Sequence, residues 1–137
     1  MTRILHIDKD DAIRFLYQDE LTEEGYEVIG TSNCNGILDK IAKLNPNIII
    51  LEPKLPEVDG LDMLQSIRGT HYNIPVILCT AYAAFRYDSR SIAADYFVIK
   101  CSDLRELKLK IKMAIDCRRV FQDESIAKSL PELHAVT

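Results

Sequence analysis

The stretch "NIIILEPKLPEVDG", residues 47–60, carries the clearest indication of the fold class. Its four consecutive apolar residues, 48–51, are typical of a strand buried on both faces of a parallel sheet. That strand ends at Glu52, and Pro53 and Pro56 follow closely. Because α/β proteins place their chemistry at the carboxyl ends of parallel strands, Glu52 stands where a reactive group is expected. The sequence therefore raises the question of whether Glu52 reacts or replaces a residue that does.

Apolar runs alternate with amphipathic segments along the rest of the chain. The pattern predicts strands at 3–7, 26–30, 48–51, 76–79 and 96–99. It predicts helices from Asp10 or Asp11 to Gly25, over 37–44, over 61–68, over a weak alanine-rich segment at 83–92, and from residue 102 or 103 onward. Five strand–helix units with right-handed crossovers predict an α/β fold with a doubly wound parallel sheet.

Length and composition limit the classes of protein that fit. The chain has 137 residues, enough for one domain, and its formal charge of 17 minus 21, or −4, argues against non-specific nucleic-acid binding. No apolar segment is long enough to span a bilayer, and the start "MTRILHID" lacks the architecture of a signal peptide, so we expect a cytoplasmic protein without a membrane partner. Four widely spaced cysteines without a CxxC pair favour neither a zinc site nor a disulfide framework.

Polar side chains follow the predicted strands at the point where each ends. The first strand is followed by Asp8, Lys9 and Asp10, and the third by Glu52. The fourth and fifth are followed by Thr80 and Lys100, respectively. In a doubly wound sheet these positions converge on one crevice.

Four motifs in this order carry a family resemblance: "ILHID", "LEPKLPEVDGLDML", "VILCTA" and "YFVIK". Residues 2–120 resemble the receiver domain of bacterial two-component response regulators. The resemblance implies a flavodoxin-like five-stranded sheet with strand order 2-1-3-4-5. It also implies a protein partner, such as a histidine kinase, an output domain or another signalling protein. We expect a receiver-like domain over 1–120 and a helical extension or linker over 121–137.

The resemblance also assigns roles to individual positions. In the family, the residue at the tip of the third strand is an aspartate that accepts a phosphoryl group, and two acidic residues after the first strand hold Mg²⁺. Thr80 and Lys100 match the residues that contact the phosphoryl oxygens. Phe97 matches an aromatic residue that changes rotamer on activation.

Three positions depart from the family pattern: Glu52 replaces the phosphoacceptor, Lys9 replaces the second acid, and Cys101 replaces a frequent proline. The usual pocket sets three carboxylates against one lysine, whereas here we expect Asp8 and Glu52 to face Lys9 and Lys100, a formal charge of zero. Such a pocket should bind Mg²⁺ weakly or not at all, and phosphoryl transfer depends on that metal. Without proline, we expect a trans Lys100–Cys101 bond.

Several functions remain open at this point. The departures favour an interaction module that works without phosphorylation, with no catalytic residue, and Glu52 either pairs with a lysine or imitates a phosphorylated aspartate. The alternatives are a conventionally phosphorylated receiver and a phosphotransferase-type enzyme with Asp8 as nucleophile. The sequence disfavours the enzyme because it has no glycine-rich phosphate loop.

Two aromatic residues, Phe85 and Tyr87, mark an expected partner face. They lie on the predicted helix at 83–92, which together with the fifth strand and the last helix forms the usual interaction face of the resembled family. A protein partner or a second copy of the chain can use this face, and equally one of the two rings can fill the core. By contrast, His6 lies inside the first strand, where we expect a core histidine whose ring nitrogens have partners.

Overall fold

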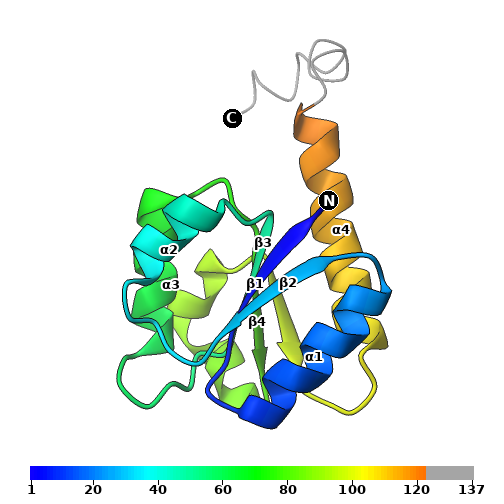
Figure 1. The fold of residues 1–137 in the computed structure, drawn as a ribbon. Helices are drawn as coiled ribbons and strands as arrows, with labels where there is room; N and C mark the ends of the chain where they lie inside the picture. The colour runs from blue at the N-terminus through cyan, green and yellow to red at the C-terminus, as the bar shows by residue number, and fades with distance from the viewer. Residues whose placement is uncertain (123–137) are drawn as a thin grey trace.

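The computed structural model describes residues 1–122, which form a single five-stranded parallel sheet with helices on both faces (Figure 1). The strand order is β2-β1-β3-β4-β5, as predicted. The strands are β1 (Arg3–Ile7), β2 (Glu27–Thr31), β3 (Ile48–Leu51), β4 (Val76–Thr80) and β5 (Tyr96–Ile99). The doubly wound, flavodoxin-like fold predicted from the sequence is therefore confirmed.

Two helices cover each face of the sheet (Figure 1). Helices α1 (Asp11–Glu23) and α4 (Arg105–Gln122) lie on one face, and α2 (Ile37–Leu44) and α3 (Gly60–Thr70) lie on the other. Each pair closes its own hydrophobic cluster against the sheet. Alternate residues of the central strands belong to the two clusters, because successive side chains in a strand point to opposite faces. Thus Ile48 and Ile50 pack on the α1/α4 side, and Ile49 and Leu51 pack on the α2/α3 side.

The central strands end level with one another, and this alignment creates the site. In β1 and β3, Ile7 lies opposite Leu51, and both strands run in parallel. The Glu52 backbone N–H donates to the Ile7 carbonyl at 2.9 Å, so the ladder extends one residue past the strand. Between β4 and β5, the Lys100 N–H donates to the Thr80 carbonyl, also at 2.9 Å. The polar residues that follow the strands therefore meet at one edge.

Two aspartates begin the helices that border this edge. Asp10 caps α1 by accepting from the N–H groups of Ala12 and Ile13, and Asp59 caps α3 in the same way. At the start of α3 the chain folds back on itself so closely that a Cβ on Gly60 would lie 2.3 Å from the Pro53 carbonyl oxygen. Only glycine fits there. The close contact between Gly60 and Pro53 therefore sets the path of the loop 53–60, which follows Glu52.

The predicted helix over 83–92 is wrong. The segment forms two short 3₁₀ helices, η1 (Ala83–Tyr87) and η2 (Ser89–Ala93), separated by Asp88 in an extended conformation. Asp88 caps the second helix through the Arg90 N–H, and the Ser91 hydroxyl donates to the carbonyls of Arg86 in the first helix and of Asp88 between the two. Side chains that bond to nearby backbone compete with a continuous α-helix, and this segment contains several.

The other predicted boundaries hold to within about three residues, as is usual for helix ends. Helix α4 begins at Arg105 and continues through Gln122, so it crosses the domain boundary expected after residue 120. The rest of the predicted extension or linker, 123–137, lies outside the described residues. Among the residues that the structure describes, no helix is long and apolar enough to cross a membrane.

Candidate functional site

A buried cluster of three charged side chains occupies the carboxyl edge of the sheet. Lys100 Nζ lies 2.6 Å from Asp8 Oδ2 and donates a hydrogen bond to Glu52 Oε1 at 3.0 Å. The contact with Asp8 is an ion pair between two side chains that are largely withdrawn from solvent. Asp8 and Glu52 are only 1% and 3% exposed. One ammonium group therefore bridges two buried carboxylates.

Backbone N–H groups hold the remaining oxygens of the two acids. The Asp10 N–H donates to Asp8 Oδ1 at 2.9 Å, and the Lys54 N–H donates to Glu52 Oε2 at 3.2 Å. Burial alone would lower the pKa of Lys100, but its contacts with Asp8 and Glu52 outweigh burial and raise that pKa above its usual value. The lysine is therefore charged at neutral pH, and the three side chains sum to a formal −1.

Lys9 and Asp10 lie outside this cluster, contrary to the expected arrangement. Lys9 is exposed and, within the part of the chain that the structure describes, forms no ion pair with Asp8 or Glu52. Asp10 is exposed as well, and its carboxylate caps α1. Both side chains sit at the start of a helix that runs along the surface, which turns them outward.

Thr80 and Phe97, which the family resemblance matched to phosphoryl contact and to a rotamer change respectively, lie on β4 and β5. Thr80 is fully buried, and its Oγ1 accepts from the Tyr82 N–H at 3.2 Å. Phe97 is partly buried against the α2/α3 cluster. The guanidinium of Arg86 lies 4.9 Å from the centroid of the Phe97 ring, so a cation on η1 covers this aromatic side chain.

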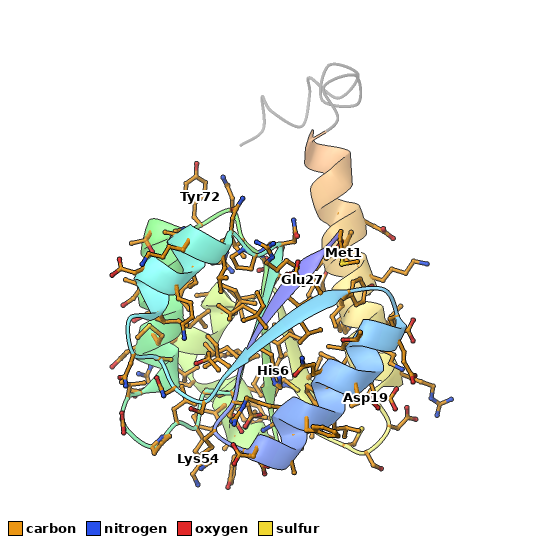
Figure 2. All side chains as sticks on the ribbon, in the orientation of Figure 1. Met1, His6, Asp19, Glu27, Lys54 and Tyr72 are labelled. Atoms are coloured by element: carbon orange, nitrogen blue, oxygen red, sulfur yellow. The ribbon has the colours of Figure 1, made fainter. Side chains whose placement is uncertain are left out.

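A histidine that the sequence pattern indicated only as a core residue lies next to the charged cluster. His6 Nε2 lies 3.9 Å from Asp8 Oδ2, and the imidazole stacks on Tyr17 with ring centroids 4.8 Å apart. Figure 2 shows His6 between the sheet and α1. Its Nδ1 has no hydrogen-bond partner among the described residues, so the prediction of a fully satisfied ring is wrong. The spacing of His6 and Asp8 already placed them on the same face of β1.

Burial determines the charge of that histidine. Desolvation lowers the pKa of His6 from 6.5 to about 4, and the nearby Asp8 carboxylate only partly opposes this effect. The ring is therefore neutral at pH 7. Beyond it, the Tyr17 hydroxyl and Cys79 Sγ lie 3.5 Å apart in the core, and burial raises the pKa of the Cys79 thiol to about 11. His6, Tyr17 and Cys79 therefore all remain uncharged at pH 7 in the core beside the charged cluster.

The two aromatic residues expected at a partner face differ in burial. Phe85 packs partly against the α2/α3 cluster, whereas Tyr87 is 86% exposed. One ring thus contacts the core and the other faces solvent, which agrees with the alternative that one of the two rings fills the core. The Lys100–Cys101 bond is trans, like every described peptide bond, which confirms that prediction.

A second charge cluster surrounds Arg90 on the surface. Its guanidinium pairs with Asp59 at 2.9 Å, with Asp62 at 2.7 Å and with Asp88 at 2.8 Å. These contacts connect the start of α3 to η2. No sequence motif indicates this cluster, because Asp59 and Asp62 lie about 30 residues from Asp88 and Arg90.

Comparison with known proteins identifies the family of this chain. A family model described as "Response regulator receiver domain" matches residues 4–112. That match covers most of the chain, and the observed strand order is the one that the family resemblance implied. The chain therefore belongs to the response regulator receiver domains of two-component signalling.

Curated relatives and solved structures give the same result. The chain is 31% identical to the regulatory protein AtoC of Escherichia coli over 98% of its own length, and it spans 28% of that protein. It is 30% identical to the sporulation initiation phosphotransferase F of Bacillus subtilis, covering 80% of this chain and 90% of that one. Among solved structures, it is similar to the response regulator TrrA of Thermotoga maritima in complex with Mg²⁺ and BeF, with a TM-score of 0.80, 38% identity, and coverage of 83% and 99% of the two chains.

Proposed function

We propose that this receiver domain acts by binding a protein partner without phosphorylation of its strand-tip acid, with Glu52 in the place of the phosphoacceptor. The observation that carries the proposal is the 3.0 Å hydrogen bond from Lys100 Nζ to Glu52 Oε1, made by a glutamate that is only 3% exposed. In this arrangement the acid at the phosphoacceptor position already has its cation. The pocket therefore has little need for a phosphoryl group or a metal to complete it.

The position of the carboxylate supports this proposal. Both Glu52 oxygens are engaged, one by Lys100 and the other by the Lys54 N–H. An oxygen that accepts such bonds is a weaker nucleophile, and the extra methylene of glutamate displaces it relative to aspartate. Errors of about 1 Å in the position of a reacting group can cost about 10²-fold in rate.

The donor set fits Mg²⁺ poorly, so we propose that the domain binds this ion weakly or not at all. Mg²⁺ requires near-octahedral oxygen ligands and takes its charge balance from carboxylates. Here the two buried carboxylates share the Lys100 ammonium, and Lys9, at the sequence position of the family's second acid, offers no oxygen ligand. A metal would compete with Lys100 for Asp8 Oδ2 and Glu52 Oε1.

The partner that we propose is another signalling protein. The relative TrrA has been solved in complex with the histidine kinase ThkA, with a TM-score of 0.78 and 38% identity to this chain. A histidine kinase or an output domain is therefore the expected class of partner here, and a second copy of the chain is the alternative. The exposed Tyr87 on η1 marks one surface on which such a partner can dock.

Repair of the pocket tests the proposal. The double variant Glu52→Asp/Lys9→Asp rebuilds three carboxylates against Lys100, and we expect it to be labelled by acetyl phosphate only when Mg²⁺ is present. The natural protein and Glu52→Asp alone should stay near background, because residues that act as one unit give non-additive effects. Mass spectrometry of the intact protein detects a gain of about 80 Da for each phosphoryl group.

A charge-matched control separates local from general electrostatics. Glu52→Asp/Lys112→Asp changes the net charge equally but places the new acid at an exposed position on α4, and it should not be labelled. Labelling of the natural protein would contradict the proposal and favour a conventional phosphorylated receiver. Labelling of Glu52→Asp alone would show that Lys9 does not prevent metal binding.

A further inference from the structure

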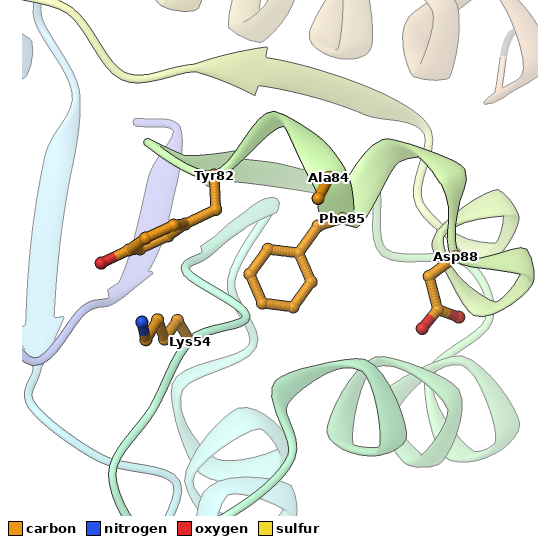
Figure 3. A pocket seen from close by; sticks show the side chains of 5 residues that line it. All are labelled: Lys54, Tyr82, Ala84, Phe85 and Asp88. Atoms are coloured by element: carbon orange, nitrogen blue, oxygen red, sulfur yellow. The ribbon is translucent and has the colours of Figure 1, made fainter.

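A pocket of about 360 Å³ lies beside the charged cluster, between the loop after β3 and the helices η1 and η2. It is lined by Lys54, Tyr82, Ala84, Phe85 and Asp88. Figure 3 shows the Tyr82 and Phe85 side chains projecting toward the same space, with Lys54 along one side and Asp88 at the far end. The pocket opens to solvent and is separate from the ion pairs of Lys100.

Two aromatic rings form its apolar wall. Tyr82 and Phe85 contact each other edge to face, with centroids 6.3 Å apart and planes at 82°. Phe85 is anchored because it also packs on the α2/α3 cluster, while Tyr82 is 46% exposed. A rigid ring beside a partly exposed one offers contact area at a low entropic cost, which is typical of binding hot spots.

The two charged side chains at the rim of the pocket, Asp88 and Lys54, differ in whether an opposite charge neutralises them. Both carboxylate oxygens of Asp88 accept hydrogen bonds from Arg90, at distances of 2.8 to 3.0 Å. By contrast, Lys54 Nζ lies 4.1 Å from the centroid of the Tyr82 ring and forms no ion pair within residues 1–122. The rim therefore presents one cation whose charge is not neutralised, at the end formed by Tyr82.

We propose that this pocket binds an apolar side chain of the protein partner, and that an acidic residue next to that side chain pairs with Lys54. The proposal rests on the proposed function, since it names the chemistry of the partner that the domain would dock. The aromatic wall accepts the apolar side chain. Because Asp88 is already neutralised and Lys54 is not, the rim selects an acidic segment over a basic one.

A peptide titration tests this selection without knowledge of the partner. The probes are two capped peptides, one with phenylalanine flanked by glutamates and one with phenylalanine flanked by lysines. We expect the acidic peptide to cause saturable amide shifts at Lys54, Tyr82, Ala84 and Phe85, with a dissociation constant of about 1 mM. The basic peptide should bind about tenfold more weakly or not at all.

Two charge-reversal variants sharpen the test. Lys54→Glu should reverse the preference between the peptides, whereas Lys112→Glu, an equal change at an exposed position on α4, should leave it unchanged. Equal binding of both peptides, no saturable shifts at the pocket, or no effect of Lys54→Glu would each overturn the proposal. Shifts of the same residues on simple concentration of the protein would overturn it in favour of a second copy of the chain.

This titration uses neither a phosphoryl donor nor a metal. A negative result would therefore contradict the proposed docking at the pocket, and it would not affect the labelling experiment on Glu52. Conversely, labelling of the natural protein would contradict the proposed function and leave the peptide result valid as a property of the surface.

Discussion

Two clusters of like composition, one buried and one exposed, have different consequences for this protein. At the strand tips, Lys100 bridges Asp8 and Glu52 in the interior. On the surface, Arg90 contacts three aspartates within 3 Å, but all of these groups reach water. Both clusters join segments that are distant in sequence, and the distances alone do not tell them apart.

Burial separates the two clusters. Taking charges out of water is costly, so removing one member of a buried cluster leaves the others uncompensated. Surface pairs have water as an alternative partner, and salt screens them. The strand-tip cluster should therefore govern stability and site chemistry, whereas the Arg90 cluster should only steady the segment between β4 and β5.

The largest effect is expected for Lys100→Met. This change keeps an unbranched side chain but leaves the carboxylates of Asp8 and Glu52 buried without their cation. We expect the free energy of unfolding to fall by about 3 kcal/mol at pH 7, near the lower end for a broken buried ion pair because Lys100 keeps some exposure. Urea denaturation monitored by circular dichroism measures this loss.

Adding Glu52→Gln to Lys100→Met should restore part of that stability, because one of the two unpaired charges disappears. Lys112→Met, an equal change on the surface of α4, serves as the control and should be nearly neutral. If Lys100→Met lowers the free energy of unfolding no more than this control does, the buried cluster does not stabilise the fold.

The second effect concerns His6 and pH. Its pKa is about 4 in the folded protein against 6.5 as the ordinary value, so between these pH values the unfolded chain binds the extra proton. The contribution of neutral His6 to stability is thus fully present above about pH 6.5 and is lost as the pH falls toward 4. The shift corresponds to about 3 kcal/mol at most. Urea denaturation at a series of pH values measures it.

His6→Phe is the matched variant, since phenylalanine keeps the stacking on Tyr17 but cannot take up a proton. Its stability should depend less on pH between 4 and 6.5 than that of the natural protein. Parallel pH profiles for the two proteins would show that carboxylates alone produce the acid sensitivity.

The smallest effect is expected for Arg90→Ala in the exposed cluster. Its thermal midpoint should fall less than that of Lys100→Met, and roughly 0.5 M NaCl should remove most of the difference, because the screening length is then about 4 Å. Thermal denaturation at low and high salt checks this. A salt-independent loss as large as that of Lys100→Met would end the contrast between the two clusters.

Much of the site was predictable because local patterns carry it. The apolar run 48–51 identified the central strand, and the positions after the strands identified Asp8, Glu52, Thr80 and Lys100. The sequence left Asp10 and Asp11 as alternative caps of α1, and the structure shows that Asp10 is the cap. By contrast, other features depend on how side chains pack in three dimensions. They are the outward placement of Lys9, the lack of a partner for His6 Nδ1 among residues 1–122, and the pocket beside Phe85.

Hydrophobic periodicity places most of the strands and helices along the chain, and the right-handed crossovers of a parallel sheet bring the polar residues to one edge. Which cation pairs with Glu52, by contrast, depends on the folded chain. Lys9 and Lys100 were equal candidates by charge. The Lys100 side chain, which follows β5, reaches Glu52 at the end of β3, while Lys9 at the start of α1 is exposed to solvent. Formal charge is a property of composition, whereas the strength of an ion pair depends on distance and burial, which only the folded chain defines.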